Sequence, residues 1–394
     1  MIQVLKKTAL LAAASAFGAA AYAANVDVIA TGLHNPRGLS FGDDGTLYVA
    51  EAGLGAGDGS GQHSAPGLGA TGSIAAIINA KSPHPNVRRV VKDLASVSTP
   101  RGEVTGADGV SIRGDKMYII ETESTAAQLK NLLGGASALS DAQLDTVQEL
   151  GKLLSADLRE DSGEREERGH RNLVTIAAVG DINYAWTDVN QAAAFAPRGQ
   201  FPDANPYAVL ATRGREYVAD AGANTIDEVL ADGSVRIVAY LPNPPVSDAV
   251  PTCMAIGSDH MLYVGTLAFG ANFAFGGGGA TPQSLVYRFD PTSTLGVQFL
   301  TAANVWASGF FPITGCGFSG SAFYVTEFWT NLAPPGGGDV VKVMLNPDGT
   351  AGSRTHLGEA VLNTPNGFAA GADGAIYVSN HSTSEDGSVV RITP

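Results

Sequence analysis

The sequence is short of positive charge. It contains 24 Lys and Arg residues against 38 Asp and Glu residues, which gives a formal net charge of −14 at pH 7. Binding to DNA or RNA depends on clustered basic side chains that neutralise phosphates, and this composition argues against such binding. We therefore expect no nucleic-acid partner, and the acidic balance suits a soluble exported protein.

Cysteine is also scarce, because the chain has only Cys253 and Cys316. There is no C-x-x-C motif, and no cysteine spacing typical of a zinc site. The two residues fall at nearly the same place in neighbouring repeats of the chain, which would allow contact. The sequence leaves open whether they form a disulfide, as an exported compartment permits, or are two buried small residues.

Long apolar runs are absent after the first residues. Lys6 and Lys7 precede an apolar stretch over residues 8–20, and Ala-Tyr-Ala at 21–23 is a typical cleavage site. This pattern predicts a signal peptide over residues 1–23, a mature chain from Ala24, and a secreted or periplasmic location. A membrane anchor would need a longer apolar segment. Loss of the two lysines changes the net charge from −14 to −16, and we expect no membrane span in the mature chain.

One phrase is present in abundance, since the chain repeats a strand with a central tyrosine. The copies are TLYVAE at 46–51, KMYIIE at 116–121, REYVAD at 215–220, MLYVGT at 261–266, AFYVTE at 322–327 and AIYVSN at 375–380. Each follows a shorter apolar strand and a turn, which is typical of a β-hairpin. Two further strands follow in each repeat. Six repeats of four strands predict an all-β fold, a six-bladed β-propeller forming a single domain over residues 24–394. A β-sandwich is the alternative.

The two ends of the chain are predicted to complete one blade. The last repeat stops after its third strand, at Thr393, and residues 26–33 form a strand without a repeat of their own. The N-terminal strand is therefore expected to serve as the outer strand of the last blade, which removes an open edge. The repeated tyrosines recur in blades with different loops, so we interpret them as packing residues between sheets.

The longest insertion, residues 124–171, follows the second strand of blade 2. Ser124 is a candidate cap of a short helix, and Ser140 with Gln143 forms a capping-box pattern. A second helix is predicted from its apolar face, at Leu144, Val147, Leu150, Leu154 and Leu158. Insertions at this point and the starts of first strands share one face of a propeller. The helical insertion is either a lid over the central pocket or a packed ornament, and the sequence does not decide between them.

Two rings of polar residues are predicted at this face. The strand-end residues close the second strands: Glu51, Glu121, Asp220, Thr266, Glu327 and Asn380. The strand-start residues open the first strands: Arg37, Asp108, Tyr207, Thr252, Thr314 and Asn366. Clustered carboxylates repel one another unless they are neutralised. Ca²⁺ or another divalent cation could lie among five of the strand-end residues, Glu51, Glu121, Asp220, Glu327 and Asn380. Alternatively, Arg37 neutralises the acids, or each acid caps backbone N–H groups of its own turn.

The same face gives the candidate ligand-binding residues. They are Arg37, Asp203, Asn205, Tyr207, Asp220, Asn224 and Asn366. Aromatic side chains could line the walls, namely Trp186, Phe201, Phe269, Phe273 and Trp329. We expect a monomeric binding module that presents a loop-walled pocket to a small molecule or a partner protein. The alternative is an enzyme at the same mouth, either a metal-assisted hydrolase or lactonase or an oxidative enzyme. No catalytic residue can be named.

Four segments carry a family resemblance: GLHNPRGLSFGDDGTLYVAEAG at 32–53, PDANPYAVLATRGREYVADAGANT at 202–225, AVPTCMAIGSDHMLYVGTL at 249–267 and TPNGFAAGADGAIYVSN at 364–380. In these the chain resembles the ScyD/ScyE family of exported proteins. The resemblance implies a six-bladed propeller of the NHL type and supplies no catalytic residues. The chain is more distantly similar to gluconolactonase-like propellers, which hold a metal on a glutamate where Arg37 stands here. It also shares a strand motif with quinone-dependent sugar dehydrogenases.

Overall fold

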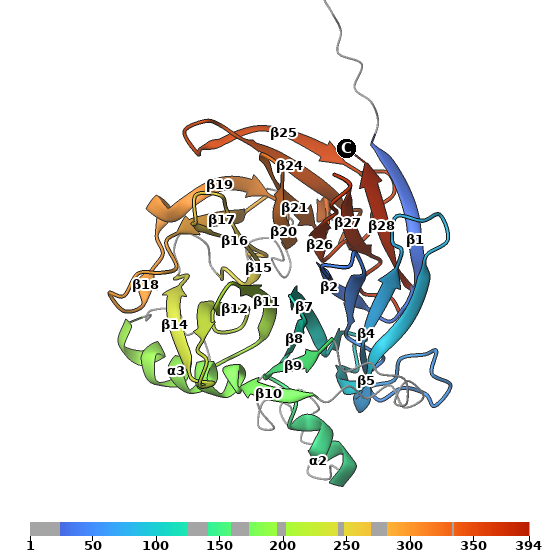
Figure 1. The fold of residues 1–394 in the computed structure, drawn as a ribbon. Helices are drawn as coiled ribbons and strands as arrows, with labels where there is room; N and C mark the ends of the chain where they lie inside the picture. Colours follow the sequence, from blue (N-terminus) through green and yellow to red (C-terminus); the bar gives the residue numbers. More distant parts are fainter. Residues whose placement is uncertain are drawn as a thin grey trace, which may run out of the picture.

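The protein is a ring of six antiparallel sheets around a central axis (Figure 1). The structure is a computed structural model that describes residues 24–123, 141–158, 173–194, 202–242, 248–268, 282–332 and 335–393. Each sheet has four main strands, and the first strands of neighbouring sheets contact one another around the axis. This arrangement is a six-bladed β-propeller, and it confirms the predicted all-β fold.

The first three blades follow one another along the chain. Blade 1 contains β2 (Pro36–Phe41), β3 (Leu47–Glu51), β4 (Gly67–Ile78), β5 (Asn86–Ser98) and the short edge strand β6 (Val104–Thr105). Blade 2 contains β7 (Ala107–Arg113), β8 (Lys116–Glu121), β9 (Leu153–Asp157) and β10 (Val174–Ala177). Blade 3 contains β11 (Pro206–Thr212), β12 (Arg215–Asp220), β13 (Thr225–Val229), β14 (Val235–Tyr240) and the parallel edge strand β18 (Gln298–Phe299).

The remaining blades complete the ring. Blade 4 contains β15 (Pro251–Ile256), β16 (Leu262–Thr266), β17 (Ser284–Phe289) and β19 (Val305–Phe310), with the 3-10 helix η2 (Ala302–Asn304) before its last strand. Blade 5 contains β20 (Ile313–Ser319), β21 (Ala322–Glu327), β24 (Asp339–Leu345) and β25 (Ala351–Leu357). Blade 6 contains β26 (Phe368–Ala370), β27 (Ile376–Asn380) and β28 (Gly387–Thr393). A two-stranded ribbon, β22 (Asn331–Leu332) with β23 (Pro335–Gly336), stands apart.

The N-terminal strand closes the ring as expected. β1 (Asn25–Leu33) lies antiparallel to β28, with Asn25 opposite Thr393 and Val26 opposite Ile392. The two strands are side by side at one edge of the ring, where blue and red ribbons meet (Figure 1). The first and last strands of the described chain thus share one sheet, and the backbone groups of β28 are paired on both sides.

Apolar side chains between neighbouring sheets make the core. The repeated tyrosines belong to it, since Tyr217, Tyr263 and Tyr377 are fully buried. Tyr377 of blade 6 meets Phe41 of blade 1 edge to face, with ring centroids 5.0 Å apart. This confirms that the tyrosines are packing residues between sheets.

The predicted second helix of the insertion is mostly wrong. Helix α2 covers only Asp141–Val147, and the part with Leu154 is strand β9, whose Tyr118–Ser155 pairing joins it to β8. Gly151 separates the two with φ 72°, a backbone conformation that an L side chain rarely adopts and that no helix continues through. The apolar spacing imitated a helix because β9 is buried on both faces.

The described part of the insertion is not placed over the axis. Val147 and Leu150 pack against Leu68, Ala95 and Val97 of blade 1, and α2 stands at the outside of the ring (Figure 1). This part of the insertion therefore packs against the outside of blade 1 instead of covering the central pocket. The helix predicted to begin at Ser124 lies outside the described residues.

Helix α3 (Val179–Ala194) occupies the segment that looked like a long connector between blades 2 and 3. Its Val179 packs with Val218 and Val229 of blade 3. This helix was not predicted, because Asp181, Asn183, Thr187 and Asn190 are poor helix formers. Tertiary contacts with blade 3 decide the conformation. Among the described residues, no helix is long and apolar enough to cross a membrane.

The two cysteines form a disulfide. Cys253 on β15 and Cys316 on β20 have Cα atoms 5.6 Å apart and join the innermost strands of blades 4 and 5. The alternative of two buried free thiols is therefore excluded.

Candidate functional site

The six first strands enclose a channel along the axis. A cavity of about 280 Å³ is lined by residues of β2, β7, β11, β15, β20 and β26. Glycines such as Gly109 and Gly317 let the strands approach closely, since a Cβ at Gly317 would lie 2.5 Å from the Phe368 ring. The channel wall is thus tightly packed. A ligand would therefore contact polar side chains mainly where the channel opens.

A second cavity, the mouth cavity, lies where the first strands begin. Its volume is about 380 Å³. Its lining consists of Asn35, Arg37, Arg101, Gly102, Glu103, Val104, Thr105, Asp108, Asn205, Tyr207, Leu267, Thr314, Phe328, Asn366 and Thr383. Four candidate ligand-binding residues are therefore brought together, namely Arg37, Asn205, Tyr207 and Asn366. Sequence reasoning missed Arg101, Glu103 and Phe328, which come from loops without any repeated pattern.

A polar layer separates the two cavities, because both are lined by Asp108, Tyr207, Thr314 and Asn366. Arg37 is fixed in this layer. Its Nε lies 3.3 Å from Oδ1 of Asp108, its Nη2 donates to the Val104 carbonyl at 2.9 Å, and its Nη1 donates to the Ser382 carbonyl. Burial raises the pKa of Asp108 although the Arg37 charge opposes that shift.

Tyr207 and Asn366 form a second pair in the same layer. Nδ2 of Asn366 donates to the Tyr207 hydroxyl at 2.7 Å. Loss of solvation raises the pKa of Tyr207 to about 12, so the hydroxyl keeps its proton and can donate it to a ligand. Oδ1 of Asn205 accepts from the Glu123 backbone N–H at 3.4 Å. The layer thus combines donors and acceptors on fixed strands.

The strand-end residues lie elsewhere, because neither cavity is lined by any of them. Glu51, which is fully buried, accepts from the His34 N–H at 2.8 Å, from Ser73 Oγ at 2.6 Å and from the Arg89 guanidinium. Asn380 accepts from the Asn363 N–H at 2.7 Å. Both residues thus accept from a backbone N–H group in the segment before the first strand of their blade, and not from the turn after their own strand.

Asp220 is capped most completely. It accepts from the backbone N–H groups of Asn205, Gly222 and Ala223 and from Nδ2 of Asn183 on α3. The Asn183 amide also donates to Asp227 at 2.7 Å. Burial raises the pKa of both carboxyls, that of Asp227 strongly, because Asp220 is a second carboxyl beside it. Asp220 is buried behind the mouth and is not exposed to a ligand.

Glu121 has no such contacts, since among the described residues neither of its carboxyl oxygens has a hydrogen-bond partner. It is fully buried, and burial together with the charges of Glu149 and Asp108 raises its pKa well above the ordinary value. Burial without a hydrogen-bond partner therefore favours the protonated, neutral form of Glu121.

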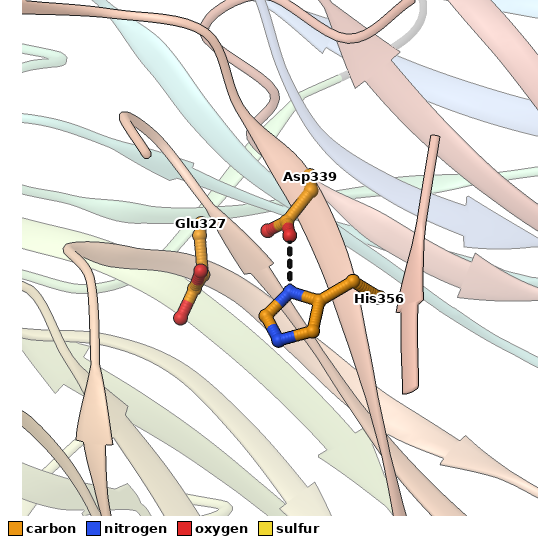
Figure 2. A group of neighbouring side chains, drawn as sticks. All are labelled: Glu327, Asp339 and His356. Atoms are coloured by element: carbon orange, nitrogen blue, oxygen red, sulfur yellow. Dashed lines mark hydrogen bonds and ion pairs between the residues drawn. The ribbon is translucent and has the colours of Figure 1, made fainter. Parts of the chain in front are cut away.

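Glu327 differs again. Its Oε1 accepts from the Phe311 N–H at 2.9 Å, and its side chain meets Asp339 and His356 (Figure 2). Sequence reasoning missed both partners. Asp339 is the first residue of β24 and His356 lies on β25, the third and fourth strands of blade 5. The repeated sequence pattern covers only the first two strands of each blade.

The other candidates have local roles or fall outside the description. Asn224 is almost fully buried, with φ 56°, and bonds to Asp248 and to the Val250 N–H. Asp203 is held through its backbone by Thr187. The Trp186 ring contacts Tyr240, and the Trp329 ring contacts Phe328. Phe201, Phe269 and Phe273 lie outside the described residues.

No protein-family model matches the sequence, and no curated protein matches it. Solved structures of similar fold include a putative oxidoreductase (glucose dehydrogenase) from Thermus thermophilus, with TM-score 0.55, 12% identity and coverage of 94% of this chain and 100% of that chain. For a PQQ-bound aldose sugar dehydrogenase from Streptomyces coelicolor, the TM-score is 0.53 and the identity 12%, with 94% of this chain and 98% of that chain covered. For the apo form of a soluble aldose sugar dehydrogenase from Escherichia coli, the TM-score is 0.50 and the identity 10%, with 94% of this chain and 99% of that chain covered. At such low identity the likeness shows a shared fold alone.

Proposed function

We propose that this protein is an exported propeller of the ScyD/ScyE type that binds a small polyhydroxylated molecule, such as a sugar, in the mouth cavity. The observation that carries the proposal is the cavity itself, about 380 Å³ in volume and walled by Asn, Tyr and Phe side chains on fixed strands and loops. Ligand sites in proteins commonly enclose about 300–1,000 Å³. The cavity lies at the lower end, which suits a small ligand.

The polar groups suit hydroxyls, which both donate and accept hydrogen bonds. Tyr207 has a hydroxyl hydrogen to donate, and within the described residues no hydrogen bond uses Nδ2 of Asn205 or Oδ1 of Asn366. Phe328 offers an apolar surface for the C–H groups of a sugar ring. Because Arg37 is bonded to Asp108 and two carbonyls, it is a poor anchor for an anionic ligand.

An oxidative enzyme is the second candidate, and it is favoured by the sugar dehydrogenases of similar fold. PQQ is a tricarboxylate, so its site needs several free cationic groups. In the mouth cavity Arg37 is already bonded within the protein, and Arg101 shares the cavity with the acidic Glu103 and Asp108. These residues do not fit PQQ, and we derive no redox step.

Titration with a panel of neutral aldoses and polyols, followed by calorimetry, tests the proposal. We expect at least one to bind, and Asn205→Ala and Tyr207→Phe each to weaken binding about tenfold, the effect of one lost hydrogen bond. Lys81→Ala, an exposed residue near the β4–β5 turn, is the control and should leave affinity unchanged. Absence of binding, or affinity unaffected by both mouth variants, would overturn the proposal.

A parallel assay addresses the second candidate. The protein is incubated with PQQ and Ca²⁺, and oxidation of aldoses is followed with an electron-accepting dye. We expect no aldose-dependent dye reduction above the protein-free background. Reduction that depends on both PQQ and protein would favour the oxidative enzyme instead.

A further inference from the structure

Three side chains converge at one end of blade 5, and none of them lines the mouth cavity. Glu327 ends β21, Asp339 begins β24 opposite it, and His356 lies on β25 (Figure 2). One ligand atom from each lies within 4.8 Å of the others, and Nδ1 of His356 is 2.5 Å from Oδ2 of Asp339. Because three adjacent strands supply them, their relative positions are fixed by the sheet.

Two buried carboxyl groups meet in this group, and among the described residues His356 alone forms an ion pair with either of them. Glu327 is 2% exposed and Asp339 1% exposed, and among the described residues Oε2 of Glu327 and Oδ1 of Asp339 have no hydrogen-bond partner. Two buried carboxyls with unused oxygens beside an imidazole are typical of a cation site.

Blade 1 shows how the same three positions are neutralised by a built-in cation. Glu51 pairs with Ser73 as Glu327 pairs with Asp339. Two residues further along the third strand, Ala75 faces Arg89 and Val341 faces His356. In blade 1 the Arg89 guanidinium bonds both oxygens of Glu51, at 2.7 and 2.9 Å.

Blade 5 replaces that arginine by His356 and the serine by Asp339, so it loses a cation and gains an anion. Arg354, whose charge also acts on Glu327, does not substitute for it. Its guanidinium bonds the Ser308 and Gly309 carbonyls and lies over the Phe310 ring, 4.0 Å from the centroid.

We propose that Glu327, Asp339 and His356 bind a divalent transition-metal ion of the Zn²⁺ type. One imidazole with two carboxylates is a set that Zn²⁺ accepts, whereas Ca²⁺ prefers oxygen ligands throughout. On binding, the proton between His356 and Asp339 is released to solvent, and their two ligand atoms, 2.5 Å apart, separate to accept Zn–N and Zn–O bonds of about 2.0–2.2 Å. The His356 side chain is 48% exposed, which leaves a route for the ion and a coordination position for water. The ion ties together three strands of blade 5.

Calorimetric titration of the EDTA-treated mature protein with Zn²⁺ alone tests this site. We expect about one equivalent to bind. Asp339→Ser combined with His356→Arg copies the blade 1 arrangement and should abolish that binding while the fold is kept. His63→Ala removes an exposed histidine paired with Glu385 and should leave the stoichiometry unchanged. Equal Zn²⁺ binding by the wild type and the double variant would overturn the proposal.

A measurement on the wild type alone covers the case in which the double variant does not fold. Crystals of wild-type protein soaked in Zn²⁺ should show an anomalous peak at the zinc absorption edge between Glu327 and His356. Zinc peaks confined to other histidines, or none at all, would equally overturn the proposal. Zn²⁺ should also raise the melting temperature of the wild type and not that of the double variant, because an ion bound to the native state alone stabilises it.

Discussion

A carboxyl group ends the second strand in four of the six blades, and each has a different environment. Glu51 is bonded to an arginine, Asp220 to three backbone N–H groups and an amide, and Glu327 meets a second acid and a histidine. Glu121 has no hydrogen-bond partner among the described residues. A shared position in the repeat therefore fixes where the carboxyl lies and leaves its protonation to neighbours that differ between blades.

Removal of the Arg89 side chain should expose the cost of an unpaired buried charge. Arg89→Ala is expected to lower the free energy of unfolding by about 3 kcal/mol, the lower part of the range for broken buried pairs, because Arg89 keeps 34% exposure. Urea denaturation at pH 7 measures it. Lys92→Ala, an exposed neighbour on β5, is the control. An equal effect of both variants would contradict the argument.

The buried Glu121 carboxyl should make the protein less stable as the pH rises. The pKa of Glu121 in the folded protein lies well above its value in the unfolded chain, which is near 4.5. Below that pH the group is protonated in both states, and its burial does not reduce stability by ionisation. As the pH rises above that value, the unfolded state alone releases its proton, and stability falls by about 1.4 kcal/mol per pH unit up to the folded pKa.

The variant Glu121→Gln removes that titration. Its melting temperature should exceed that of the wild type at pH 8, and the difference should shrink at pH 5. A variant less stable than the wild type at both pH values would mean that the Glu121 carboxylate is charged and held by a cation.

At the scale of elements, the disulfide links two strands that no backbone hydrogen-bond ladder joins. β15 and β20 belong to different sheets, and 63 residues separate Cys253 from Cys316 in the sequence. Closing a loop of that length lowers the entropy of the unfolded chain, which corresponds to about 4 kcal/mol. The bond thus stabilises the contact between blades 4 and 5 through the unfolded state.

Replacement of both cysteines by alanine should lower the free energy of unfolding by up to about 4 kcal/mol, measured by urea denaturation. A reducing agent should destabilise the wild type and leave the double variant unaffected. If the reducing agent changed the stability of the double variant as well, the effect could not be assigned to this bond.

At the scale of the whole molecule, the ring depends on a strand from the far end of the chain. β1 supplies the fourth strand of blade 6, and its Leu33 is buried with Val389 and Tyr377 in one cluster. Without β1, the outer edge of β28 and the apolar residues beneath it would meet solvent.

Deletion of residues 24–33 should therefore lower the melting temperature and cause association visible by size-exclusion chromatography. A synthetic peptide of residues 24–33, added in excess, should restore the melting temperature by pairing with β28. A peptide of the same composition in scrambled order is the control. A truncated protein as stable as the chain of residues 24–394 would show that closure by β1 is dispensable.

The sequence by itself determined the fold, because the propeller is built from local hairpins. Each repeat contains the residues of its own turn and its own packing tyrosine. The strand-start residues were predictable for the same reason, and five of them do line the mouth cavity, namely Arg37, Asp108, Tyr207, Thr314 and Asn366. The helix predicted through Leu154 was wrong, because apolar spacing does not distinguish a helix from a strand buried on both faces.

Only the tertiary structure decided which polar residues share a site. Glu327, Asp339 and His356 come from three strands whose register brings them together, and register depends on turns, bulges and packing across the sheet. Cys253 and Cys316 likewise became partners through the closeness of two blades. The repeat fixes contacts within a hairpin, whereas contacts between strands and blades depend on the closed ring.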